Sequence, residues 1–202
     1  MAACGQCGQR PPRRQCPALQ AEICAPCCGE ERERTIDCPF DCAYLLQARE
    51  REPMFALPAA YPNQDLDTGE RFLRAHEPLL LTMVGMLFFA AVKAGAADLD
   101  VRAALGAMIR ERRGGECELD LGERAALVKA EFEARFAEFE AKASAEGAAF
   151  EARDVLRILA FFEREELQYN NQRPKSRAYI DWLRGWVSEM ARSLTPVTEA
   201  GS

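Results

Sequence analysis

The sequence has very little histidine, since His76 is the only one among 202 residues. A catalytic triad would have to use this one ring, and nothing in the sequence pairs it with a nucleophile. The nucleotide-binding patterns G-x-x-x-x-G-K-[ST] and G-x-G-x-x-G are missing as well. His76 stands beside Glu77 at an expected helix start, so we interpret it as a surface or capping residue. We therefore expect a protein that is not an enzyme.

The sequence also lacks a long apolar run of the kind that spans a membrane. Its longest run, residues 79–92, covers about 21 Å as a helix, whereas the hydrocarbon core of a bilayer is about 30 Å thick. Extension to residue 97 brings in Lys93. We expect a buried bundle helix here, with a membrane-associated protein anchored by residues 79–97 as an alternative. No basic segment followed by an apolar one opens the sequence, so we expect no signal peptide and a cytoplasmic protein.

Cysteine, by contrast, is abundant and concentrated. The sequence holds nine cysteines, and only Cys117 lies outside the first 42 residues. Pairs with C-x-x-C spacing in a chain without an export signal favour zinc over disulfides. Tetrahedral zinc takes four ligands, so eight cysteines predict two structural zinc ions. The predicted ligands are Cys4, Cys7, Cys16, Cys24, Cys27, Cys28, Cys38 and Cys42.

The residues around these cysteines indicate how the backbone could present them. Gly5, Gly8 and Gly29 are expected to supply turns with positive φ. Residues 38–42, Cys-Pro-Phe-Asp-Cys, look like a helix start with the proline in the first turn. Positions four apart on a helix share a face, so the two cysteines of this segment could bind one ion.

Two other interpretations of the clustered cysteines remain open at this point. An iron–sulfur cluster also takes four cysteines, although its usual tight runs are missing. The vicinal pair Cys27 and Cys28 could be a redox switch in which oxidation releases zinc. Cys117 follows two glycines in a loop-like stretch, and we interpret it as an incidental thiol.

The first five intervals between cysteines resemble the B-box family of zinc modules, over about 40 of the 202 residues. In that family the ligands of two sites interleave in a cross-brace. The resemblance implies that one site takes Cys4, Cys7, Cys24 and Cys27. Cys16 would belong to the second site, but Leu19 stands where the family has the next ligand, and the closing histidines are missing. The residues that can replace them are Cys28, Cys38 and Cys42, and on sequence alone Cys27 and Cys28 are interchangeable.

Two strings of residues also resemble the beginning and the end of the sequences of a group of uncharacterised bacterial proteins. The first string comprises Cys27-Cys28-Gly29, Arg32, Ile36, Cys38-Pro39, Asp41-Cys42 and Tyr44-Leu45. The second comprises Asn171, Arg173-Pro174, Arg177-Ala178, Ile180-Asp181 and Leu183. This resemblance implies a bacterial cytoplasmic protein and brings no known activity with it.

Positive charge is in deficit, which bears on possible partners. The net charge is −6, so the whole molecule is not an electrostatic nucleic-acid binder. Residues 1–52 hold seven arginines and eight acidic residues. Eight thiolates and two zinc ions would bring this segment to about −5, which makes a poor phosphate ligand. Arg10, Arg13 and Arg14 still offer a local patch, and this patch carries the alternative of a nucleic-acid-associated regulator.

The rest of the sequence predicts helices. Apolar residues at helical spacing favour helices over residues 79–92, 101–113, 121–145, 149–169 and from Ser176 onward. Asp98 or Asp100 is expected to cap the second of these, and Gly114 to end it. We therefore predict a small zinc-stabilised finger followed by an all-α bundle of about five helices.

The predicted boundaries and function follow from this organisation. Residues 1–52 form the finger with an exit helix over 43–52, and residues 68–195 form the bundle. Between them, the proline-rich residues 53–67 form a linker or a loop lying across the bundle, and residues 196–202 form a frayed tail. We predict a non-catalytic interaction or adaptor protein with a protein partner, which binds through exposed anchors such as Tyr44 and Leu45. We expect no binding of nucleic acid or membrane.

Overall fold

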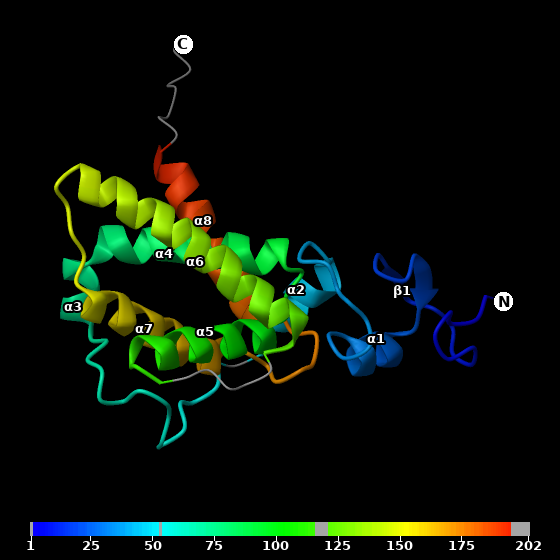
Figure 1. Ribbon diagram of the computed structural model, residues 1–202. Coiled ribbons are helices and arrows are strands. Elements are labelled where there is room, and N and C mark those ends of the chain that lie inside the picture. The colour runs from blue at the N-terminus through cyan, green and yellow to red at the C-terminus, as the bar shows by residue number, and fades with distance from the viewer. Residues whose placement is uncertain (1, 53, 116–120, 195–202) are drawn as a thin grey trace, which may run out of the picture.

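The computed structural model describes residues 2–52, 54–115 and 121–194. Cys117 and the tail predicted over 196–202 lie outside the described residues. The finger contains β1 (Arg14–Cys16), β2 (Ala21–Ile23), α1 (Ala25–Glu31) and α2 (Ala43–Arg49). The helices that follow are α3 (Glu70–Ala75), α4 (Glu77–Lys93), α5 (Asp98–Arg112), α6 (Gly122–Ala145), α7 (Ala152–Tyr169) and α8 (Ala178–Leu194). A small cysteine-rich finger therefore precedes a helical bundle, as predicted, and Figure 1 shows the finger in blue at one end of the bundle.

The five long helices occur close to where the apolar spacing predicts them. In the bundle, α4 packs against α6 and α8, and α5 packs against α6 and α7 (Figure 1). Leu87, Phe132 and Phe162 are fully buried where these helices meet. Gly114 and Gly147 follow the ends of α5 and α6 with φ of 80° and 78°, a conformation that glycine adopts without strain.

The apolar helix α4 is a core element of this bundle. Its 17 residues end at Lys93, and Gly95 just beyond them has a positive φ of 57°. Its buried residues are Leu79, Leu80, Met83, Val84, Leu87, Ala90 and Ala91. Within the described ranges, no helix has the length and apolar character needed to cross a membrane.

The two aspartates near the start of α5 have different roles. A carboxylate oxygen of Asp100 accepts a hydrogen bond from the backbone N–H of Ala97 at 2.9 Å and so caps α5. The carboxylate of Asp98, which is fully buried, instead accepts hydrogen bonds from Ser176 Oγ at 2.6 Å and from the backbone N–H of Ile180 at 3.1 Å. Asp98 thus caps α8, which follows it by about 80 positions.

The prediction that a helix begins at Cys38 is wrong. The backbone N–H of Cys42 donates to the carbonyl of Pro39 at 3.1 Å, which closes a turn, and Cys42 then serves as the N-cap of α2. The turn sends the ring of Phe40 away from the finger and onto the bundle core. There the guanidinium group of Arg177 lies 5.4 Å from the ring centroid. Packing of this aromatic side chain accounts for the turn in place of a helix.

Residues 54–69 lie across the bundle as an irregular segment. The backbone N–H of Phe55 donates to the carbonyl of Gln168 at 3.0 Å, at the end of α7. Further along, the side-chain amide of Asn63 donates to the Glu163 carboxylate at 2.6 Å. These contacts hold the segment against α7.

Candidate metal centre

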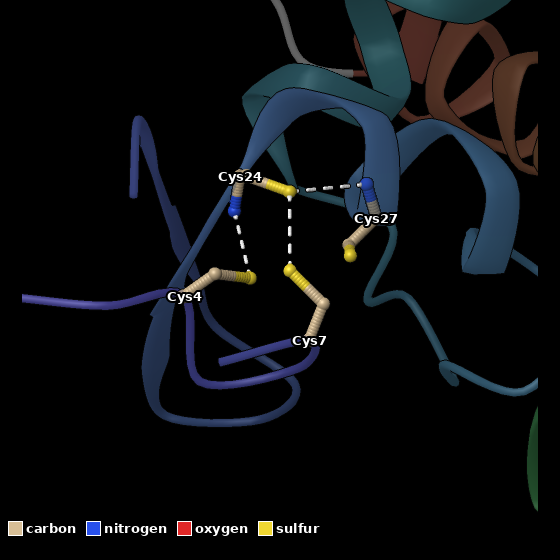
Figure 2. Close-up of side chains that lie close together, drawn as sticks. All are labelled: Cys4, Cys7, Cys24 and Cys27. Atoms are coloured by element: carbon tan, nitrogen blue, oxygen red, sulfur yellow. Dashed lines mark hydrogen bonds between the residues drawn. The ribbon is translucent and has the colours of Figure 1, made fainter. Parts of the chain in front are cut away.

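Four cysteines from two segments of the finger gather their sulfur atoms around one point. Cys4 and Cys7 lie in the loop before β1, whereas Cys24 is the N-cap of α1 and Cys27 lies in its first turn. Their four Sγ atoms all lie within 4.8 Å of one another, and those of Cys7 and Cys24 are 4.0 Å apart. Figure 2 shows the four side chains pointing inward at one another. This is the set that the B-box resemblance implies for one site.

Glycines help to shape the first half of the site, but only partly as predicted. Gly8, directly after Cys7, has a φ of 65°, and its N–H donates to the carbonyl of Cys4 at 2.8 Å. Gly5 and Gly29 do not have positive φ, contrary to expectation. Gly5 instead allows a close approach, because a Cβ there would lie 3.2 Å from the Cβ of Ala21, which would then have to shift slightly.

Backbone N–H groups point at the sulfur atoms and favour their ionised form. The N–H groups of Cys24 and Gln6 approach Cys4 Sγ at 3.1 and 3.4 Å, and the N–H of Cys27 approaches Cys24 Sγ at 3.5 Å. Burial disfavours the thiolate of Cys4, but hydrogen bonds from Cys7, Cys24 and Gln6 outweigh it and lower the pKa of Cys4 to about 6. This stabilisation of a thiolate is what metal binding requires.

The four thiols also influence one another strongly. Hydrogen bonds from the backbone of Gln9 and Arg10 lower the pKa of Cys7. The hydrogen bond with Cys24, followed by burial, raises the pKa of Cys27 to about 12. Four sulfur atoms so close together repel one another once ionised, and a cation between them removes that repulsion.

The arrangement can hold one metal ion. Tetrahedral zinc–sulfur bonds of about 2.3 Å place the sulfur atoms about 3.8 Å apart, close to the 4.0 Å between Cys7 and Cys24. Thiols within 4.8 Å of one another leave no room for the inorganic sulfides of an iron–sulfur cluster. Three of the four cysteines are buried, and a site with four cysteine ligands has no open position for a substrate.

The other four predicted ligands do not form an equally tight cluster. Cys16 and Cys28 are buried in the same apolar cluster as the first site, and Cys38 packs against it. Cys42 is buried at the start of α2. Burial raises the pKa of Cys38, and the charges of Cys42, Glu33 and Cys16 raise it further. The thiols are therefore neighbours, but among the residues that the structure describes only the first set meets the mutual distance of 4.8 Å.

The three arginines of the predicted basic patch have different surroundings. A hydrogen bond with Cys24 raises the pKa of Arg10, so its guanidinium group lies at the cysteine cluster. The guanidinium carbon of Arg14 lies 4.8 Å from the ring centroid of Tyr44, and Arg13 is exposed. Leu45, expected as an exposed anchor, is only 1% exposed.

The single histidine has a structural position. The Nδ1 atom of His76 lies 2.9 Å from the carbonyl oxygen of Phe72, and its Nε2 atom lies 3.2 Å from the Asp154 carboxylate. It stands at the junction of α3 and α4, in the capping position expected for it.

A hollow between the end of the finger and the bundle was not predicted from the sequence. Its volume is about 310 Å³, and its lining includes Met54, Phe55, Tyr169 and Trp182. These residues lie in a loop and in two different helices, so no local spacing connects them. An apolar pair directly after a proline in a polar segment was the only local signal.

No known protein family, no curated protein and no solved structure matches this chain. The resemblances to B-box modules and to the bacterial group therefore stay predictions, and the function has to be argued from the residues themselves.

Proposed function

We propose that this chain is a non-catalytic zinc-binding adaptor, in which zinc folds the finger and the hollow beside α2 docks a partner protein. The hollow is the observation that carries the docking proposal. Met54 and Phe55 on its rim are 56% and 44% exposed, which is unusual for large apolar side chains next to each other. The rings of Tyr169 and Trp182 stack with their centroids 5.0 Å apart on its inner side. Aromatic residues and methionine are the residue types that protein interfaces favour.

The proposed occupant is an extended segment of a partner protein that carries a large apolar side chain. The charged residues of the hollow already form ion pairs, because Arg49 Nη1 lies 2.7 Å from the Asp181 carboxylate and Glu52 lies 3.2 Å from Arg173. A charged ligand would have to compete with these pairs, whereas an apolar side chain would add contacts with the exposed rim. A volume of about 310 Å³ leaves space for one large side chain with its neighbouring backbone.

The zinc proposal has two sites. The first takes Cys4, Cys7, Cys24 and Cys27, whose donor atoms suit a soft divalent ion with tetrahedral geometry. The second takes Cys16, Cys28 and Cys38, which share one apolar cluster, together with Cys42, whose charge acts on Cys38, and a bound ion would draw these four thiols together. We further propose a cytoplasmic location, because eight unpaired cysteines suit a reducing compartment.

Elemental analysis of protein purified without added metal tests the zinc proposal. We expect about two zinc ions per chain, as eight thiolate ligands in sets of four require. One zinc ion per chain would contradict the second site. A folded chain free of zinc, or a visible iron–sulfur absorption band, would contradict both sites.

Co-purification from the native host with matched variants tests the docking proposal. The double variant Met54→Ala, Phe55→Ala removes the exposed rim, and Phe89→Ala is the control, because Phe89 is 50% exposed on α4 away from the hollow. We expect a partner that is retained at high salt by the unmodified protein and by the control, and lost with the double variant. Recovery of the same proteins with all three would overturn the proposal. Recovery only at low salt, together with nucleic acid, would favour the regulator interpretation instead.

A further inference from the structure

We propose that a second hollow, between α1 and α2, binds a small multivalent anion of the phosphate class. This hollow shares the lining residue Glu52 with the docking hollow, but the proposal does not depend on the docking proposal. Its volume is about 290 Å³. The lining residues that carry the argument are Arg14, Gly29, Arg32, Tyr44, Ala48 and Arg51.

The two helices present matching faces to this hollow. On α1, Ala25 and Gly29 are four positions apart, and neither has a bulky side chain that would fill the hollow. Nothing lies within 4 Å of a Cβ added at Gly29. On α2, Ala48 has the same role, a full helical turn after Tyr44. Residues four apart share a helix face, so both helices present small residues to the hollow and leave it open. Longer side chains surround this open space.

Three arginines surround that space. Arg32, just after α1, donates from Nη1 to the carbonyl oxygen of Tyr44 at 3.2 Å. Its Nε is buried and has no hydrogen-bond partner among the described residues. Arg14 is held over the Tyr44 ring with its guanidinium carbon 4.8 Å from the centroid, and Arg51 lies exposed at the rim. A guanidinium group offers several N–H donors in one plane, which is the geometry that binds phosphate oxygens in pairs.

These arginines lack the acidic partners that other arginines of the chain have. Arg49 contacts two carboxylates, those of Glu33 and Asp181, at 2.6 and 2.7 Å. Over residues 2–52, 54–115 and 121–194, no carboxylate forms an ion pair with Arg14, Arg32 or Arg51. The acidic residue on the rim, Glu52, lies 3.2 Å from Arg173 and is neutralised there. In a protein of net charge −6, three unpaired arginines around one hollow indicate an anionic ligand.

The arrangement favours a compact ligand with at least two negative charges. Three guanidinium groups around a confined space can bind several oxygens of one phosphate or diphosphate group at once. Arg14 covers one face of the Tyr44 ring, so that face is not open for stacking a base. The ligand class is therefore set by its phosphate group.

Isothermal titration of the full-length, zinc-loaded protein with inorganic phosphate and with pyrophosphate at low salt tests this site. Arg14→Gln and Arg51→Gln each remove one guanidinium group, and Arg13→Gln is the control, because Arg13 is an exposed arginine next in sequence that does not line the hollow. Circular dichroism and zinc content show that each variant is folded. We expect pyrophosphate to bind more tightly than phosphate, and each of the two variants to bind about tenfold more weakly, with the control unchanged.

Three results would overturn the proposal. One is the absence of saturable binding at up to about 5 mM pyrophosphate, beyond the millimolar range of weak recognition. Another is an equal affinity of all three variants for pyrophosphate. Zinc extraction by pyrophosphate, or general charge attraction, would affect the three variants alike. The third is a 20-base-pair DNA duplex that binds more tightly than pyrophosphate and loses affinity in Arg14→Gln and Arg51→Gln, since the occupant would then be a nucleic-acid backbone.

Discussion

The side-chain amide of Asn171 donates a hydrogen bond to the carboxylate of Glu33 at 2.8 Å, and so joins two residues 138 positions apart. Glu33 lies in the turn after α1, and Asn171 lies in the turn between α7 and α8. The same carboxylate, 1% exposed, accepts hydrogen bonds from Arg49 Nη2 at 2.6 Å and from the backbone N–H of Arg177 at 3.3 Å. One buried negative charge of the finger is thus bound by groups of both the exit helix and the bundle.

The variant Glu33→Gln tests this junction. It removes a buried charge while the positive charge of Arg49 stays, with Asp181 as its remaining partner at 2.7 Å. Loss of one member of a buried charged network is strongly destabilising, so we expect the free energy of unfolding to fall by about 2–4 kcal/mol. Urea unfolding of the zinc-loaded protein measures it.

Glu30→Gln is the matched control, because Glu30 is an exposed glutamate only three positions away. We expect its unfolding free energy to stay within about 0.5 kcal/mol of the unmodified protein. Similar values for the two variants would mean that the Glu33 carboxylate contributes nothing specific at the junction.

Removal of zinc tests how far the finger and the bundle depend on each other. We expect a strong chelator to unfold the finger and leave the bundle helical, since the apolar core of the bundle is formed almost entirely by residues of α3 to α8. The bundle should nevertheless melt about 5–10 °C lower, because it loses the contacts of Glu33 and Phe40. Circular dichroism during heating, with and without chelator, measures both effects. Loss of the whole helical signal at room temperature would show that the bundle cannot fold without the finger.

Single cysteine substitutions test the assignment of ligands to sites. Cys24→Ser should remove the ion of the first site, and Cys38→Ser that of the second, so each variant should retain about one zinc ion. Cys117→Ser should retain two, because this cysteine is not a predicted ligand. Elemental analysis of the three purified variants gives the answer. Loss of both ions in either single variant would show that the two sites fold as one unit.

The helical bundle was predictable because its signals are local. Phe132 and Phe136 are four positions apart in α6, and both are buried, as one face of a helix requires. Gly114 marked the end of α5 correctly. The pairs of cysteines with C-x-x-C spacing were equally informative, since each pair is a local turn that brings two sulfur atoms together.

Features that depend on distant residues were not predictable in the same way. Nothing near Asp98 indicates that its carboxylate caps α8, because Ser176 and Ile180 become its partners only when the bundle folds. Leu45 was wrongly expected to be exposed, because the sequence of its own helix does not show which distant residues cover it. The hairpin of β1 and β2 was missed because strands of three residues are too short to show an alternating pattern.

The dependence of stability on pH should reveal whether the side chain of Glu166, a fully buried residue of α7, is protonated in the folded protein. Arg102 of α5 and the side-chain amide of Asn170 donate hydrogen bonds to its carboxylate. Burial nevertheless raises the pKa of Glu166 to about 7, with Arg102 and Asn170 opposing the rise and the charge of Asp98 adding to it. In the unfolded chain the pKa of a glutamate is about 4.3.

Between these two pKa values the folded protein retains a proton that the unfolded chain has released. Stability from this group is therefore greatest at low pH and falls as the pH rises from about 4.3 to about 7. Each pKa unit corresponds to about 1.4 kcal/mol, so we expect a loss of about 2–3 kcal/mol across this range.

Comparison with Glu166→Gln isolates this effect, because glutamine has nearly the same shape and does not titrate. Protonation of the zinc-binding thiols at low pH weakens metal binding in both proteins equally, so it cancels in the difference between them. We expect the unmodified protein to lose about 2–3 kcal/mol relative to the variant as the pH rises from about 5 to about 8, measured by urea unfolding at each pH. A difference that stays constant, or that changes in favour of the unmodified protein, would mean that Arg102 stabilises the ionised carboxylate more strongly than burial opposes it.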